Sequence, residues 1–189
     1  MNVLPRLQFK IEQIGRIIQA GGVVAYPTEG VWGLGCDPWN PDAVGRILDI
    51  KGRAVDKGLI LIGSDFDQLA PWLAPLSADQ IDQLEQSWPG PHTWVVPHNG
   101  ELPEWVTGGR DTIAVRVPGH PLARALCSAA GTPIVSTSAN RSGRPGITDL
   151  LQIRLKLGLE VDAILPGHTL PGAQPSQIRD LATGQLLRA

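Results

Sequence analysis

Residues 112–137 read TIAVRVPGHPLARALCSAAGTPIVST and contain two strand-like segments separated by a helix-like one. The alternation of apolar with small or polar side chains over 112–117 predicts a strand with two different faces. A helix is expected over 121–130 because Gly131 can end it. A second strand at 134–137 leads into a polar loop. Strands interleaved with helices indicate a layered α/β arrangement.

The same interleaving extends outward in both directions. Apolar residues at helical spacing over 7–18 predict a helix that the glycine pair 21–22 can end. Further helices are expected to begin at Asn40-Pro41 and at Ser77, since proline suits the first helical position and serine caps a helix. The other expected elements are a helix at 150–157 and strands at 23–26, 59–62, 94–96, 163–165, 176–179 and 186–188. The closely spaced late strands favour a mixed sheet.

The composition limits the classes of protein to which the chain can belong. At 189 residues, with 42% hydrophobic and 18% charged residues, the chain suits a single globular domain over 1–189. The formal net charge is −2, whereas proteins that bind nucleic acid through a broad phosphate footprint are usually basic. Any contact with RNA is therefore expected to be weak and local, or made through partner proteins.

Cysteine and hydropathy patterns indicate a cytoplasmic protein. Cys36 and Cys127 lie far apart and form no CxxC pair, which predicts free thiols rather than a disulfide scaffold or a zinc site. Residues 1–20 carry charges among their apolar positions, unlike a signal peptide. No run of about 18 apolar residues occurs, so no membrane span is expected.

Templates for covalent or metal catalysis are absent from the sequence. There is no P-loop, no GxSxG or HExxH pattern, and no close cluster of His, Cys and Asp. Each histidine adjoins a proline or a glycine, which indicates loops without metal-ligand spacing; they are His92, His98, His120 and His168. Any enzyme activity is therefore expected to rest on binding and electrostatics, with no protein-bound metal.

Four polar segments stand out at the ends of expected strands, and two of them lie in the N-terminal half. Tyr26–Gly30 continues into the glycine-rich stretch 33–35, which predicts a backbone loop that approaches a ligand, or a plain turn. Further on, Lys51, Arg53 and Lys57 fall within seven residues, between a helix and a strand. These cations predict a polyphosphate cradle. Alternatively, Lys51 only complements the negative end of its own helix.

The other two polar segments belong to the opening stretch. Arg116 shares a strand face with Thr112, and an arginine in an apolar strand needs a partner carboxylate or a bound anion. Ser136, Ser138 and Asn140 project together if the chain stays extended. Their hydroxyl and amide groups suit phosphate oxygens or a purine, and a helix cap or Asx turn is the alternative.

Taken in order, these segments resemble the YrdC-like family of threonylcarbamoyl-AMP synthases, in its short, single-domain bacterial (TsaC-like) form. The resemblance covers nearly the whole chain, and its specificity comes from seven collinear pieces rather than from any one of them. The pieces are Tyr26-Pro27-Thr28-Glu29, Gly33-Leu34-Gly35, Lys51-Gly52-Arg53, Trp88-Pro89-Gly90-Pro91-His92-Thr93, Ala114-Val115-Arg116-Val117 with His120-Pro121, Ser136-Thr137-Ser138-Ala139-Asn140 with Ser142-Gly143, and Pro175-Ser176.

The resemblance implies an α+β, three-layer YrdC/RibB-like fold, with a twisted mixed β-sheet flanked by helices around a basic cleft. It also implies a nucleotidyltransferase. Threonine and bicarbonate or CO2 form a carbamate, the carbamate attacks the α-phosphorus of ATP, and pyrophosphate leaves. A separate protein complex then transfers the threonylcarbamoyl group to tRNA, as N6-threonylcarbamoyladenosine beside the anticodon.

The resemblance further implies roles for individual residues. Two catalytic cations would hold the triphosphate of ATP, namely Lys51 and Arg53. The other ATP-binding residues would be Thr112, Ser136, Ser138 and Asn140. L-Threonine would be bound by Thr28, Arg116 and Ser176. The expected cofactor is Mg²⁺, carried on the phosphates rather than in a protein cage.

Three positions depart from many relatives, and two of these positions help to bind the amino acid in longer relatives. Gly30 stands where many have a second threonine, Ile62 where many have histidine, and Gln177 where many have threonine. The resemblance therefore supports nucleotide binding more strongly than it supports selectivity for threonine. The alternative function is a tRNA- or ribosome-binding module that uses the basic cleft without chemistry. Six tryptophans could serve such a module by stacking on bases, but Trp32, Trp88 and Trp94 sit in apolar or turn contexts, which predict packing in the core or the cleft wall instead.

Overall fold

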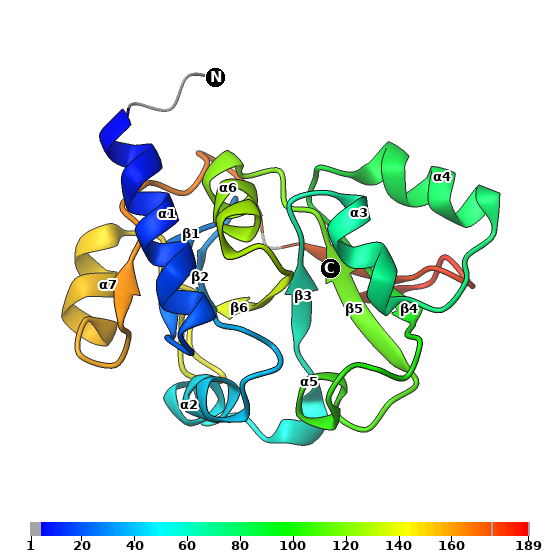
Figure 1. Cartoon of the computed structure of the whole chain (residues 1–189), viewed down its shortest axis with the longest axis horizontal. Helices are drawn as coiled ribbons and strands as arrows, with labels where there is room; N and C mark the ends of the chain where they lie inside the picture. Colours follow the sequence, from blue (N-terminus) through cyan, green and yellow to red (C-terminus); the bar gives the residue numbers. More distant parts are fainter. Residues whose placement is uncertain (1–4, 175, 189) are drawn as a thin grey trace.

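The computed structural model describes residues 5–174 and 176–188, and Pro175 of the Pro175-Ser176 piece lies outside them. The described strands form one mixed sheet in the order β7-β1-β2-β6-β3-β5-β4-β8-β9 (Figure 1). The strands are β1 Val24–Pro27, β2 Trp32–Gly35, β3 Ile60–Ile62, β4 His92–Pro97, β5 Thr112–Arg116, β6 Ile134–Ser138, β7 Ala163–Ile164, β8 Gln177–Asp180 and β9 Leu186–Arg188.

The helices fall mostly where the sequence predicts them. They are α1 Pro5–Gln19, α2 Pro41–Lys51, α3 Phe66–Leu69, α4 Ala78–Ser87, α5 Glu104–Thr107, α6 Pro121–Ala130 and α7 Leu150–Leu157, with 3-10 turns at Val55–Lys57 and Ala70–Trp72. Asn40 caps α2 by accepting from Ala43 N at 3.0 Å. Ser77 and Gln80 form a capping box on α4. The short helices α3 and α5 had not been predicted.

Strand β6 joins two parts of the sheet. It pairs antiparallel with β2 on one side and with β3 on the other. The parallel pairs are β1 with β7, β3 with β5, and β4 with β8, whereas the other pairs are antiparallel. The predicted mixed sheet is confirmed.

The predicted glycine-rich loop at 33–35 is wrong, because these residues form strand β2. The glycines serve close packing rather than loop flexibility. A Cβ atom would lie 3.1 Å from the Tyr26 ring at Gly33 and 2.9 Å from it at Gly35. The chain instead turns between β1 and β2, where Thr28 Oγ1 donates to the carbonyl of Val31 at 2.6 Å.

Side-chain alternation divides the core between the two faces of the sheet, which gives three layers. One face buries α1 and α6 against Tyr26, Ile62 and Ile134. The opposite face packs against α2 and α4, and Leu61, Val115 and Val135 point that way. The three-layer α+β fold is therefore confirmed. Three tryptophans predicted to pack rather than stack on bases are indeed buried, namely Trp32, Trp88 and Trp94.

Helices α1 and α6 cover only part of their face. Beyond them the same face continues through Ile60 of β3, Ala114 of β5, and Ser136 and Ser138 of β6, whose register brings them side by side. These residues line a cavity. The strand alternation predicted for 112–117 is confirmed, since Thr112, Ala114 and Arg116 line this cavity while Val115 and Val117 are core residues outside its lining. Ile113 is a core residue that also borders the cavity.

Candidate functional site

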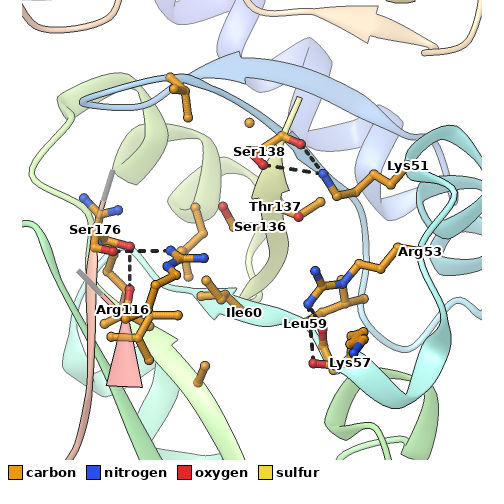
Figure 2. A pocket seen from close by; sticks show the side chains of 18 of the residues that line it. Lys51, Arg53, Lys57, Leu59, Ile60, Arg116, Ser136, Thr137, Ser138 and Ser176 are labelled. Carbon is orange, nitrogen blue, oxygen red and sulfur yellow. Dashed lines mark hydrogen bonds between the residues drawn. The ribbon is translucent and has the colours of Figure 1, made fainter. Parts of the chain in front are cut away.

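The cavity has a volume of about 730 Å³ and gathers all nine predicted site residues (Figure 2). Lys51 and Arg53 lie on one side of it, Arg116 and Ser176 on the other, and Ser136 and Ser138 between them (Figure 2). Its described lining includes no Asp, Glu, His or Cys. Its cationic lining residues are Lys51, Arg53, Lys57, Arg110, Arg116, Arg144 and Arg188. A cavity with this charge suits a polyanion.

Lys51 ends helix α2 and is buried, with 3% of its surface exposed. Its Nζ donates to the carbonyls of Ser138 at 2.6 Å and Asn140 at 2.9 Å. The ammonium therefore ties α2 to the loop after β6, and these contacts are not with its own helix end. One ammonium has three donors, and Nζ also lies 3.5 Å from Ser138 Oγ, at the limit of a hydrogen bond. A ligand can replace this long third contact. Burial lowers the pKa of Lys51 to about 8, and the nearby Arg53 adds to the shift.

This lowered pKa predicts that ATP binding to the free protein weakens with alkaline pH. Lys51 carries its charge below pH 8 and loses it above, so affinity should be flat below that value. Above it, Kd should rise by roughly tenfold per pH unit, as linkage requires when only the charged form binds. Titration of ATP at pH 6.5 to 9.5 checks this. Lys51→Met should remove the pH dependence; a Kd that is constant across the range in the wild type would contradict the role of Lys51.

Arg53 follows the left-handed cap residue Gly52. Its Nη2 donates to the carbonyl of Gly58 at 3.0 Å, and its Nε is buried with no protein partner among the described residues. Burial lowers the pKa of Arg53, and Arg188 is the next cause. A buried donor without a partner is costly, so this guanidinium has capacity for an anion.

The hydroxyl groups of β6 lie between the two cationic ends. Tyr26 is fully buried, which raises its phenol pKa, and its OH donates to Ser136 Oγ at 2.8 Å. Ser136 accepts this bond, so its own proton can be donated to a ligand. Asn140 also lines the cavity, but its Nδ2 donates to the carbonyls of Arg141 and Arg144, and its Oδ1 is buried with no partner in the described part of the chain. The contacts of Nδ2 fit the predicted local turn, while contact of Asn140 with a ligand in the cavity stays a prediction.

Arg116 has the partner carboxylate that the sequence left open. Its Nη2 donates to Oε1 of Glu29, and its Nε donates to the carbonyl of Gly90 at 2.8 Å. The guanidinium still lines the cavity. Burial lowers the pKa of Arg116, and Glu29 counteracts that shift. The ion pair and a bound anion are thus compatible, because they use different edges of one guanidinium.

The remaining predicted threonine ligands also line the cavity. Ser176 is 7% exposed, and its Oγ accepts from Thr93 Oγ1 at 2.9 Å. Thr28 lines the cavity beside Gly30 and Ile62, two of the three positions that depart from many relatives. Gln177 begins β8 and is not among the lining residues.

The histidines stay outside the cavity lining. His92 begins strand β4 rather than lying in a loop, so that prediction is wrong for this residue, because the strand pairs with β8 from His92 onward. His120 caps α6, and its ring nitrogens contact the carbonyl of His168 and the amide of Leu122. In residues 5–174 and 176–188 no group of three or more His, Cys, Asp or Glu could hold a metal ion. Cys36 and Cys127 are free and buried.

Three cations of the cavity, Arg110, Arg144 and Arg188, had not been predicted, and Lys57 belonged to the predicted polyphosphate cradle without a role of its own. Arg188 lies on β9, and its Nη2 donates to the carbonyl of Ser176 at 3.3 Å. Arg110 and Arg144 lie in loops, and Lys57 lies in the 3-10 turn after Arg53. Only Lys57 carried a signal, its closeness to Lys51 and Arg53 in sequence. The others reach the cavity through tertiary structure alone.

Comparison with known proteins decides the family. A family model for Sua5, YciO and YrdC proteins, described as "Telomere recombination", matches residues 16–189. This chain belongs to the Sua5/YciO/YrdC family. The resemblance drawn from the seven collinear pieces is therefore confirmed.

Curated members of the Sua5/YciO/YrdC family match almost the full chain. A protein of Nitrosococcus oceani is 53% identical over 180 residues, which is 95% of this chain and 97% of the relative. One from Pseudomonas aeruginosa PAO1 is 51% identical over the same shares. Both carry the name threonylcarbamoyl-AMP synthase.

Solved structures of the family support the fold. Sua5 of P. abyssi, in complex with L-threonine, superposes with a TM-score of 0.89 at 34% identity. The match covers 96% of this chain but 54% of Sua5, so this chain spans about half of that protein. YciO of E. coli gives a TM-score of 0.85 at 29% identity, with 96% of this chain and 89% of YciO covered. No helix in the described part of the chain is long and apolar enough to cross a membrane.

Proposed function

We propose that this chain forms threonylcarbamoyl-AMP and pyrophosphate from ATP, L-threonine and bicarbonate or CO2. One structural observation supports the proposal independently of the names of the relatives. A single cavity holds a cationic pair, Lys51 and Arg53, across from a second anion-binding group, Arg116 with Ser176 (Figure 2). A nucleotide and an amino acid each bring an anionic group, and this spacing lets both lie in one cavity.

The chemistry needs no protein nucleophile. The threonine nitrogen forms a bond to the carbon of CO2 and loses a proton, which gives a carbamate. A carbamate oxygen then attacks the α-phosphorus, the bond from that phosphorus to the bridging oxygen breaks, and pyrophosphate leaves. Such transfer depends on positioning and on charge neutralisation. The cavity fits this requirement, since its described lining offers cations and hydroxyls but no imidazole, thiol or carboxylate.

Within this proposal, each predicted residue has a place. Lys51 and Arg53 neutralise the triphosphate, while Thr112, Ser136, Ser138 and Asn140 contact the nucleotide. Arg116, Ser176 and Thr28 hold threonine. Mg²⁺ would enter on the ATP phosphates and supply further charge neutralisation. The donor set fits this route, because the described lining has no carboxylate that could compete for the ion.

The product would be consumed by a separate protein complex that transfers the threonylcarbamoyl group to tRNA. The cytoplasmic location predicted from the sequence belongs to the same proposal. The alternative, a tRNA- or ribosome-binding module without chemistry, predicts RNA binding that collapses with modest salt and no turnover of ATP. Against it stand the net charge of −2 and the burial of Trp32, Trp88 and Trp94.

Pyrophosphate release should require both threonine and bicarbonate. We expect radiolabelled bicarbonate to appear in an adenylate only when ATP and threonine are present together. Release of pyrophosphate is measured in parallel, with each substrate omitted in turn. Equal consumption of ATP without threonine would contradict the proposed function, and serine in place of threonine tests selectivity at the Gly30 and Ile62 end of the cavity.

A further inference from the structure

Glu29 is a buried carboxylate that belongs to the wall behind the cavity rather than to its lining. It lies in the turn between β1 and β2 and is 6% exposed. Its backbone carbonyl accepts from Leu170 N at 2.8 Å. Oε1 accepts from Arg116 Nη2 and from Gly119 N, while Oε2 is buried without a partner among the described residues. A carboxylate buried in this way needs a reason, because desolvation is costly.

The contacts of Arg116 show what Glu29 does to it. Nε donates to Gly90 and Nη2 to Glu29, so both of these nitrogens are occupied from the protein side. No described residue accepts a hydrogen bond from Nη1. The guanidinium is planar and its donors point in fixed directions. Holding Nε and Nη2 therefore determines the direction in which Nη1 and the second N–H of Nη2 point.

The loop that Glu29 touches has independent support. Arg124 Nη1 donates to the carbonyls of Pro118 at 2.7 Å and Gly119 at 2.9 Å. The loop therefore has a second anchor besides the bond from Gly119 to Glu29. Arg116 has no second carboxylate partner among the described residues. Gly90 holds Nε of Arg116, and Glu29 is the described residue that holds its Nη2. In contrast, the other ion pairs, Arg46 with Asp162 and Arg141 with Glu160, are much more exposed.

We infer that Glu29 is a positioning residue, which holds Arg116 so that the free end of its guanidinium faces the amino-acid end of the cavity. The inference rests on the proposed function, in which Arg116 binds the carboxylate of threonine. The role is geometric. A negative charge next to a carboxylate site opposes substrate binding. Glu29 therefore favours binding through the position of its Oε1 atom, which fixes the orientation of the Arg116 guanidinium.

Two variants separate geometry from charge. Glu29→Asp keeps the charge but shortens the side chain by one methylene, so Oε1 can no longer reach both Arg116 and Gly119. We expect the KM for threonine to rise roughly tenfold, the loss of one charge-assisted contact. Glu29→Gln keeps the reach, since its amide oxygen can accept both bonds. We expect its KM for threonine to stay within about threefold of the wild type, because the guanidinium keeps its direction. The urea midpoint of this variant should fall, since Arg116 loses its buried countercharge.

The KM for ATP distinguishes positioning from general damage. It should change by less than about twofold in both variants, because Lys51 and Arg53 are untouched. Gly119→Ala supplies a third test that leaves both charges in place. A Cβ there would lie 3.0 Å from Glu29 Oε1, so the carboxylate must shift, and the KM for threonine should rise while the KM for ATP holds. Urea unfolding of each variant confirms that a folded protein is being compared.

The outcomes separate this inference from the proposed function. Wild-type protein that fails to make the adenylate overturns the proposed function itself. With an active wild type, a normal KM for threonine in Glu29→Asp overturns the positioning role. The inverted order is a raised KM for threonine in Glu29→Gln and a normal one in Glu29→Asp. It would show that the charge of Glu29 matters and its geometry does not, and it also overturns the positioning role. A parallel rise of both KM values would mean that Glu29 only stabilises the fold.

Discussion

Lys51→Ala is expected to weaken ATP binding by roughly 10- to 150-fold. The ammonium is buried in the cavity wall, and charge-assisted hydrogen bonds contribute on the order of 1.5–3 kcal/mol each. At about 1.4 kcal/mol per decade of affinity, this range gives the expected factor. The substitution has a second effect, because it removes the lysine donor from the carbonyls of Ser138 and Asn140, of which Ser138 keeps the bond from Asn140 N. The loop that carries two predicted nucleotide ligands should therefore loosen.

Titration calorimetry of ATP against folded Lys51→Ala measures this loss. Lys156→Ala is the matched control, since Lys156 is exposed on α7 and lies outside the cavity lining. It should bind ATP normally. Threonine affinity in Lys51→Ala should change much less than ATP affinity, because Arg116 lies on the other side of the cavity. Unchanged ATP affinity in a well-folded Lys51→Ala protein means that Lys51 only fastens α2 to the loop after β6.

Arg116→Lys is expected to abolish most threonine binding although it keeps the positive charge. Lysine can donate to Glu29, but an ammonium cannot also present a planar pair of N–H groups to a carboxylate. The loss of one bidentate charge-assisted contact amounts to about 1.5–3 kcal/mol, or roughly 10- to 150-fold in affinity. ATP affinity should fall far less. Normal threonine binding, or an equal loss of ATP binding, would assign Arg116 to the fold or to the nucleotide.

The partner of Arg116 makes lysine a better test than alanine. Arg116→Ala would leave the Glu29 carboxylate buried without a countercharge, and breaking a buried pair in this way costs about 3–5 kcal/mol of stability. A loss of function in that variant would therefore have two explanations. Arg154→Lys, an exposed arginine on α7, is the matched control for the chemistry of the substitution. It should leave both ligands and the urea midpoint unchanged.

Much of this fold could be predicted from local signals. Asn40-Pro41, Ser77 and Gly131 mark helix ends in the sequence, and the structure has caps at each of them. Strand β2 was missed because its glycines suggest a loop when read alone. These positions need glycine because the Tyr26 ring packs against them, and that contact is apparent only once β1 and β2 are paired. A tertiary contact overrode the local preference.

The site was predictable to the extent that its residues share a strand face. Thr112 and Arg116, or Ser136 and Ser138, come together through the two-residue repeat of a strand. The sequence also required a partner for Arg116 but could not name Glu29, which is 87 positions away. Arg110, Arg144 and Arg188 were missed for the same reason. Loops and a distant hairpin bring them to the cavity, and no spacing in the sequence indicates that they lie close together.

Strand β6 separates β7-β1-β2 from β3-β5-β4-β8-β9, and this order has a consequence for biosynthesis. A ribosome releases the chain from its N-terminus, so β1 to β5 emerge before the strand that must stand between β2 and β3. Until residue 138 is made, these strands have edges with unpaired backbone groups, which invite pairing with other chains. The facing edges of β2 and β3 therefore stay open to such pairing until β6 is made.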